Sequence, residues 1–223
     1  ITSAGIPATY QERTCAMHRM MLFTILATVL GLVRAVPQCL RLLRARQAHG
    51  VSVDTAATST IVSCGWATYG LLTNQPTIGF ASGASALIFA SITVLALRFG
   101  RRVNEFKIAP VWLVVLLLAV STGGVTGLSV VLPISVLAAN IPQLWVASRE
   151  GNLNDLSLGT WLLALTEGMV WGGYGLVQGD LSVITSSGFQ VATSGLIVAF
   201  KLAHMAKRPK PPELTLHTLG EER

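Results

Sequence analysis

The sequence is apolar and poor in charge: of its 223 residues 52% are hydrophobic and 12% are charged, whereas an ordinary soluble domain has about 25% charged residues. This composition excludes a soluble globular domain and predicts an integral protein of the lipid bilayer. The formal net charge of +6 comes from bases in short loops, so we expect no nucleic-acid partner. The scattered Cys15, Cys39 and Cys64 exclude a disulfide framework and a CxxC metal site, and we expect neither metal nor cofactor.

Seven apolar segments follow one another along the chain, and most have the length of a membrane-spanning helix. A helix of about 20 apolar residues crosses the ~30 Å hydrocarbon layer. The segments cover residues 20–40, 55–73, 77–97, 108–121, 125–147, 157–177 and 181–201. The fourth is short, and the break after it (STGG, 121–124) is weak. One long helix over 108–147, with six spans in all, is therefore the alternative.

The charge of the connecting loops favours seven spans. Lysine and arginine collect in the short loops on the cytoplasmic side of membrane proteins. Basic residues follow the first, third, fifth and seventh segments, and the other three loops contain none. Seven spans place all basic loops on one side. We therefore predict a cell-membrane protein with an extracytoplasmic segment, 1–19, and a cytoplasmic, Pro-rich, disordered tail, 204–223.

Two halves of the chain match at a constant offset. Pro37-Gln38 corresponds to Pro142-Gln143, and the same spacing of 105 residues (37 to 142) links Trp66 to Trp171, Tyr69 to Tyr174 and Ser82 to Ser187. We therefore expect two triple-helix repeats, 20–97 and 125–203, joined by a linker and fourth helix, 98–124. The predicted fold is an all-α membrane protein with seven transmembrane helices, arranged as two parallel three-helix bundles around a linker helix (3+1+3). In transporters with parallel repeats, the binding site lies between the repeats near the midplane.

The duplicated Pro-Gln, the serine after it and the W-x-x-Y-G motif resemble the PQ-loop superfamily, in particular its SWEET and SemiSWEET (MtN3-like) sugar transporters. The resemblance covers about residues 20–201 and implies a central cavity and alternating access without a prosthetic group. It also implies that Pro37 and Pro142, each followed by a glutamine (Gln38, Gln143), act as hinges of the inner gate, because proline kinks a helix. Ordinary helix packing is the alternative explanation for these prolines.

The expected substrate pocket combines aromatic and polar side chains. Trp66 and Trp171 lie mid-span, where an indole offers a flat apolar face to a sugar ring. Family members usually carry asparagine where this chain has Ser82 and Ser187, which is a departure that affects substrate identity. Gln190, about one turn from Ser187, could supply the missing amide. The serines could instead serve only helix packing.

Two ionisable residues interrupt the apolar segments: Arg34 and Glu167. Such residues usually face a cavity or a partner. Glu167 precedes Trp171 by one helical turn and so shares its face. Three interpretations remain open: Glu167 couples transport to protons, it binds substrate hydroxyls or an amine, or it pairs with Arg34 at the inner gate.

The sequence as a whole predicts a SWEET-like facilitator of a small neutral polar solute, a mono- or disaccharide. The first alternative is a proton-coupled PQ-loop transporter of an amino acid or small amine that uses Glu167. The second alternative is a non-transporting receptor on the same scaffold. We expect no enzyme, since no nucleophile–base pair, phosphate loop or metal set is visible. The oligomeric state stays open, a homo-oligomer included.

Overall fold

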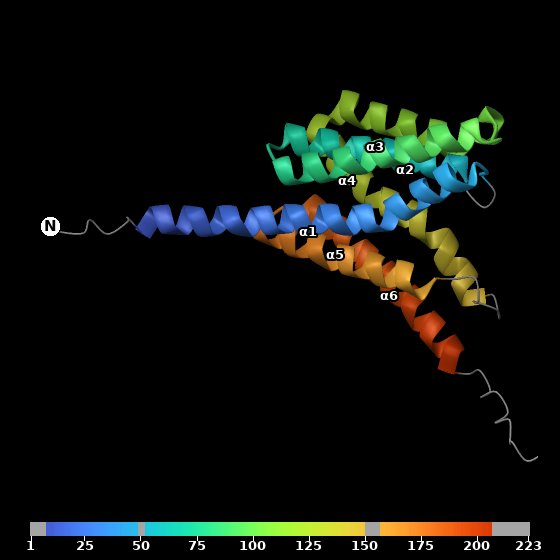
Figure 1. Cartoon of the computed structure of the whole chain (residues 1–223). Coiled ribbons are helices and arrows are strands. Elements are labelled where there is room, and N and C mark those ends of the chain that lie inside the picture. Colours follow the sequence, from blue (N-terminus) through green and yellow to red (C-terminus); the bar gives the residue numbers. More distant parts are fainter. Residues whose placement is uncertain (1–7, 49–51, 150–156, 207–223) are drawn as a thin grey trace, which may run out of the picture.

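The described part of the chain consists of helices and short connections. A computed structural model describes residues 8–48, 52–149 and 157–206, shown in Figure 1. Its α-helices are α1 (Ala8–Ala45), α2 (Val53–Leu72), α3 (Pro76–Arg98), α4 (Ile108–Arg149), α5 (Leu158–Gln178) and α6 (Leu181–Ala206). A short 3₁₀ helix, Val103–Glu105, precedes α4. Within these ranges there is no strand, so the expected all-α fold class is confirmed for them.

Four of the described helices contain segments that are long and apolar enough to cross a bilayer. These segments are Met21–Ala45, Pro76–Arg98, Ile108–Asn140 and Leu181–Ala206. Large apolar side chains such as Leu22, Leu87 and Leu117 are exposed on them, which suits hydrocarbon surroundings and not water. The chain is therefore an integral membrane protein. The helices α2, with 20 residues, and α5, with 21 residues, are not among these four.

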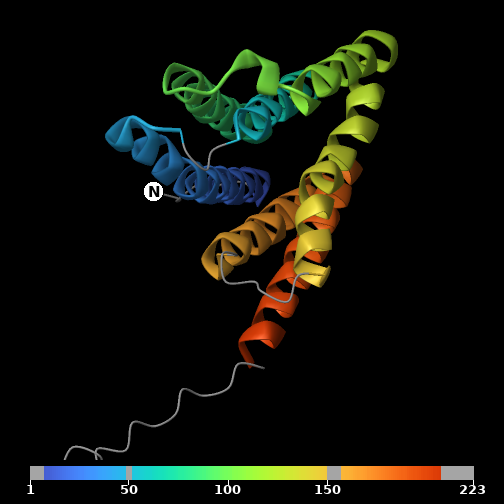
Figure 2. The same cartoon turned by 90° about the vertical axis from the view of Figure 1, so that its right-hand side faces the viewer.

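The helices form two units, and each unit contacts the other through two of its helices. In the first unit, α3 packs between α1 and α2. In the second unit, α6 packs between α5 and the later part of α4, where Leu144 of α4 lies against Ile197 of α6. Between the units, α1 contacts α5 and α2 contacts α4. Figures 1 and 2 show α1 lying between the α2–α3 pair and the α5–α6 pair.

The long helix α4 changes direction at a glycine. Gly124 has φ 55° and ψ −131°, which is not a helical conformation and one that favours glycine because it has no Cβ. A Cβ on Gly127 would clash with the backbone carbonyl of Ala119. In a straight helix, residues eight positions apart lie about 12 Å from each other, so the chain folds back here, as the bend of α4 in Figure 2 shows. Six helices are thus assigned where seven spans were expected, and the predicted break at 121–124 coincides with this reversal.

The ends of the helices differ from the expected spans. α1 begins at Ala8 and not near residue 20, so part of the predicted segment 1–19 is helical. α1 also continues to Ala45 and contains Pro37 without interruption of the assigned helix. Residues 1–7 and most of the predicted tail, from 207 onward, lie outside the described residues. The predicted order of the tail therefore stays a prediction.

The two ends of the helix bundle differ in how the units are joined. We call the end that carries the connections 73–75 and 179–180 the turn end, and the end that carries the connections 46–52 and 99–107 the basic end. At the turn end, one core joins both units through Tyr69, Ile78, Leu128, Tyr174 and Val183. At the basic end, the described residues form two separate cores, one around Leu42 and Ile92 and one around Ile197. In Figure 1 the last turns of α4 and α6 run away from α1, α2 and α3.

Candidate solute-binding cavity

A cavity of about 200 Å³ lies between the two units and is lined by residues of α1 to α6. Its wall includes all six side chains predicted to bind substrate: Trp66, Ser82, Glu167, Trp171, Ser187 and Gln190. Ser63, Ser85 and Ser186 add hydroxyl groups, and Ala27, Gly31 and Phe89 add apolar surface. The structure therefore brings together six predicted binding residues that are up to 124 positions apart in the chain (66 to 190). Their role in binding stays a prediction.

Two aromatic pairs with the same geometry lie next to the cavity on its turn-end side. Trp66 and Tyr69 pack edge to face, with ring centroids 5.6 Å apart and planes at 84°. Trp171 and Tyr174 do the same at 5.7 Å and 83°. In each pair the edge-to-face contact holds the indole in a fixed orientation. The two indoles are thus presented to the cavity by equivalent supports, one from α2 and one from α5.

Beyond these pairs, a hydrogen-bond network joins the two units at the turn end. The Tyr69 hydroxyl donates to both carboxylate oxygens of Asp180, at 3.0 and 2.9 Å. The Tyr174 hydroxyl donates to Gln75 Oε1 at 3.0 Å, and Gln75 Nε2 donates to Asp180 Oδ2 at 2.6 Å. Asp180 also accepts the backbone N–H groups of Ser182 and Val183, so it caps the N-terminus of α6.

The closing contacts are exchanged symmetrically between the units. Tyr69 and Tyr174 are equivalent at the 105-residue offset, and so are Gln75 and Asp180. Tyr69 of the first unit bonds to Asp180 of the second, and Tyr174 of the second bonds to Gln75 of the first. A two-fold axis produces such an exchange, because each residue of one unit then makes the same contact as its equivalent in the other unit. Because the contacts lie at one end of both units, that axis runs along the helices.

The second unit contributes an ordered amide to the wall. Asn140 of α4 is buried and donates to Gln190 Oε1 at 3.0 Å and to Thr193 Oγ1 at 2.8 Å. The Gln190 amide nitrogen in turn donates to Ser194 Oγ at 3.2 Å. The equivalents of Gln190 and Ser194 in the first unit are Ser85 and Phe89. The two walls therefore differ, and the more polar wall belongs to the second unit.

One hydroxyl in the wall is buried without a partner. Ser187 is 4% exposed, and within the described residues its Oγ makes no hydrogen bond. Its neighbour Ser186, by contrast, donates to the backbone carbonyl of Val183 at 3.0 Å. A buried polar group without a partner costs free energy, so the Ser187 hydroxyl is suited to bond a polar solute in the cavity.

The carboxylate of Glu167 lies against a glycine of α1. A Cβ on Gly31 would be 3.7 Å from Glu167 Oε1 and 3.5 Å from Ser85 Oγ. Both distances are ordinary van der Waals contacts. The absence of a side chain at Gly31 therefore leaves space between a carboxylate of the second unit and a hydroxyl of the first, inside the cavity.

The residues predicted to form the inner gate are not part of the described cavity wall. Pro37 and Gln38 are exposed on α1 and do not line the cavity. Arg34, Pro142 and Gln143 lie within helices, but their side chains are outside the described part of the structure. The predicted contact between Arg34 and Glu167 and the predicted hinges therefore stay predictions.

Comparisons with known proteins connect this geometry with one transporter fold. The structure matches "The 3.7 A resolution structure of a eukaryotic SWEET transporter" with a TM-score of 0.64 and 13% sequence identity. The match covers 84% of this chain and 99% of that chain. The chain has the fold of that SWEET transporter. No protein-family profile matches the sequence, and no curated protein matches it.

Several residues of the site were missed by the sequence analysis. Tyr69 and Tyr174 belong to the duplicated W-x-x-Y-G motif, but no role was assigned to them. Asp180 is the one acidic residue in the loops that lack basic residues, and its position directly before a helix is typical of a cap. Together with its equivalence to Gln75, these features could have indicated a contact between the units. For Asn140, nothing in the sequence indicated a contact with Gln190.

Proposed function

We propose that the chain is a SWEET-like facilitator that moves a small neutral polar solute, a mono- or disaccharide, down its gradient by alternating access. The observation that carries the proposal is the cavity between two units that are joined at the turn end and separately packed at the basic end. Its volume equals that of about seven molecules of liquid water at ~30 Å³ each, which favours a monosaccharide in this conformation. Two indoles and the unpartnered Ser187 hydroxyl supply the apolar and polar contacts that a sugar needs.

The proposed architecture has seven spans in the 3+1+3 arrangement. It is supported by the reversal of α4 at Gly124, by the crosswise contacts of α1 with α5 and α2 with α4, and by the symmetric exchange at the turn end. The proposed orientation places the turn end outside and the basic end in the cytoplasm of a cell. In this orientation the structure represents an inward-facing conformation, in which the Tyr69–Asp180 network forms the closed outer gate.

A second candidate function is favoured by Glu167. Placing a carboxylate within a membrane costs free energy, and such a group usually takes up a proton, binds a cation or pairs with an opposite charge. Its position beside the space at Gly31 would allow contact with a solute amine. The candidate is a proton-coupled transporter of an amino acid or small amine.

Flux into proteoliposomes tests both functions. Purified protein would be assayed for uptake of a labelled monosaccharide panel and an amino-acid panel, with and without a pH gradient. Sugar uptake that ignores the gradient and persists in Glu167→Gln supports the facilitator. Gradient-driven uptake that this variant loses supports the second candidate. Solute binding without flux contradicts transport by either mechanism.

Gly31 offers a matched pair of variants for the same assay. The space around it accepts a methyl group at ordinary contact distances, so Gly31→Ala should retain transport within about twofold. The leucine side chain of Gly31→Leu would extend into the cavity and should reduce flux to background, while the melting temperature shows that the protein is folded. Equal flux in the two variants would show that solute does not pass this point.

A further inference from the structure

The basic end of the first unit carries a concentrated patch of basic side chains. The basic patch consists of six exposed residues: Arg41, Arg44, Arg46, Arg98, Arg102 and Lys107. They come from the end of α1, the end of α3 and the connection from α3 to α4. Among the described residues of this end, the ion pair present is that of Arg101 with Glu105, at 3.3 Å. Lys107 lies close enough to Asp54 for their charges to attract each other, whereas the five arginines of the patch have no ion pair with a described residue.

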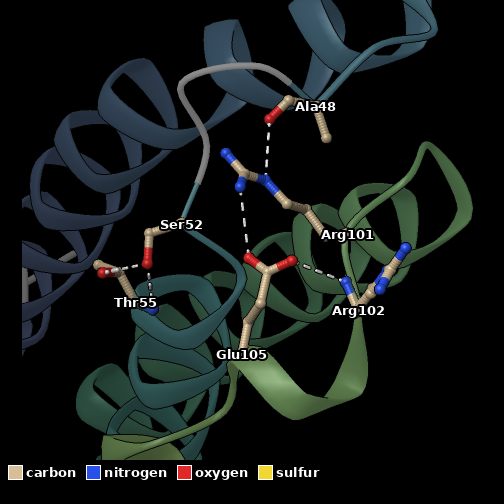
Figure 3. A network of polar contacts seen from close by, with 6 residues as sticks. All are labelled: Ala48, Ser52, Thr55, Arg101, Arg102 and Glu105. Carbon is tan, nitrogen blue, oxygen red and sulfur yellow. Dashed lines mark hydrogen bonds and ion pairs between the residues drawn. The ribbon is translucent and has the colours of Figure 1, made fainter.

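The two carboxylates that the structure describes at this end of the first unit, Asp54 and Glu105, are hydrogen-bonded to other groups. Asp54 accepts the backbone N–H groups of Lys107, Ile108 and Ala109 at 2.9 to 3.1 Å. Glu105 accepts from the Arg101 guanidinium and from the backbone N–H of Arg102. Figure 3 shows the Arg102 side chain directed away from this carboxylate. The local acids thus organise the backbone and leave the patch available to an external anion.

The patch is built on a fixed platform. Arg101 Nε donates to the Ala48 carbonyl at 3.2 Å (Figure 3) and so ties the connection after α1 to the connection after α3. The core around Leu42, with Phe99 and Phe106 packed against it, lies beneath both connections. Basic residues from three chain segments are therefore held at the same end of the first unit.

Apolar side chains accompany the bases at this surface. Val103, next to Arg102, is 69% exposed, and Ile108, next to Lys107, is 59% exposed. Exposed apolar and basic side chains in alternation are typical of segments that lie at the membrane interface, where the apolar groups enter the acyl region and the bases meet headgroups. The connection from α3 to α4 has this character.

The equivalent positions of the second unit are less basic. At the 105-residue offset, the six positions correspond to Val146, Arg149, Gly151, Ala203, Lys207 and Pro212, of which only two are basic. The preference for positive charge on the cytoplasmic side explains the sign of the charge in both units. The other bases of the second unit, Lys201, Arg208 and Lys210, lie at different positions near the end of α6 and beyond it in the sequence.

We propose that the basic patch binds the headgroups of anionic phospholipids in the adjoining leaflet. Clusters of four to eight lysines and arginines at the end of a membrane helix attract such lipids. The patch offers six bases, apolar neighbours that enter the same interface, and a backbone that is already ordered. The bound lipids would anchor the first unit at the basic end. This proposal does not depend on the identity of the transported solute.

Lipid titration of the full-length protein tests the proposal. Delipidated protein in a neutral detergent would be mixed with short-chain phosphatidylglycerol or phosphatidylcholine, and bound lipid would be counted by native mass spectrometry. The wild type should prefer phosphatidylglycerol at least tenfold, and added salt should weaken the preference because it screens exposed charges. Each base removed should weaken phosphatidylglycerol binding about fivefold.

Two triple variants with the same change in charge provide the decisive comparison. Arg41→Gln/Arg44→Gln/Arg102→Gln removes half of the patch and should abolish the preference. Lys207→Gln/Arg208→Gln/Lys210→Gln, in the tail beyond the described residues, should retain it. Equal losses in both variants, or no preference in the wild type, would overturn the proposal. Displacement of the lipid by excess inorganic phosphate would overturn it too, because it would indicate a site for soluble anions.

Discussion

At the scale of single residues, the hydroxyl of Ser187 tests whether the cavity binds a polar solute. It is buried and, among the described residues, has no hydrogen-bond partner. Ser187→Ala should therefore leave the melting temperature unchanged or raise it slightly. Solute affinity should fall about fivefold, because a typical hydrogen bond contributes about 1 kcal/mol. Melting curves and the KM for transport would measure the two effects on the same preparations.

The neighbouring serine provides the control for this prediction. Ser186 also lines the cavity, but its hydroxyl is already bonded to the Val183 carbonyl. Ser186→Ala should therefore change KM less than Ser187→Ala. A wild-type KM in Ser187→Ala would remove this hydroxyl from solute binding.

For the cavity residues, the sequence could predict which of them share a face of the same helix. Helical spacing placed Gln190 beside Ser187 and Glu167 beside Trp171, and all four line the cavity. Contacts between helices are different, because spacing along one helix says nothing about its neighbour. The bonds from Asn140 to Gln190 and from Tyr69 to Asp180 depend on how helices from different parts of the chain are placed together.

At the scale of helices, the ends were harder to predict than the spans. Hydropathy identifies the part of a helix that lies in hydrocarbon, whereas a helix continues for as long as its backbone bonds are satisfied. α1 therefore extends from Ala8 to Ala45, about 57 Å at 1.5 Å per residue, although only its apolar part was predicted. The reversal in α4 depends on the positive φ of Gly124. In the sequence, the only indication of this reversal is a weak break in the apolar pattern.

The start of α4 provides a prediction about pH. Asp54 lies just outside the predicted span 55–73 and accepts three backbone N–H groups at the start of α4. Burial alone would raise the pKa of Asp54, but the hydrogen bonds from Ala109, Ile108 and Lys107 outweigh it and hold the pKa below its ordinary value. Because the pKa of Asp54 is lower in the folded protein, its carboxylate stabilises the fold at any pH above the unfolded-state pKa of about 3.9. This stabilisation is lost as the pH falls through the lower pKa of the folded state.

Asp54→Asn measures this contribution. The variant should have a lower melting temperature than the wild type at neutral pH, corresponding to a loss of about 1 kcal/mol for a helix cap. Below about pH 4 the difference should shrink, because the wild-type carboxyl becomes protonated as well. A difference that stays constant from neutral to acid pH would show that Asp54 does not act through its charge.

At the scale of the whole molecule, the sequence indicated two units but not the contacts between them. The 105-residue offset indicated two similar units, and the exchange between Tyr69–Asp180 and Tyr174–Gln75 agrees with a two-fold axis along the helices. The sequence could not show which end of the cavity is closed. That depends on how the two units are tilted relative to each other, and the proposed transport cycle requires this tilt to change.

The proposed transport cycle requires the turn end to open and close, and a reversible cross-link between the units tests this requirement. In a chain with Cys15, Cys39 and Cys64 replaced by alanine, Gln75→Cys and Asp180→Cys would be joined by a short cross-linker that a reductant cleaves. Single-cysteine variants treated in the same way are the controls. The account predicts that proteoliposome flux is lost when the link forms and returns when it is cleaved. Undiminished flux through the fully linked protein would contradict it.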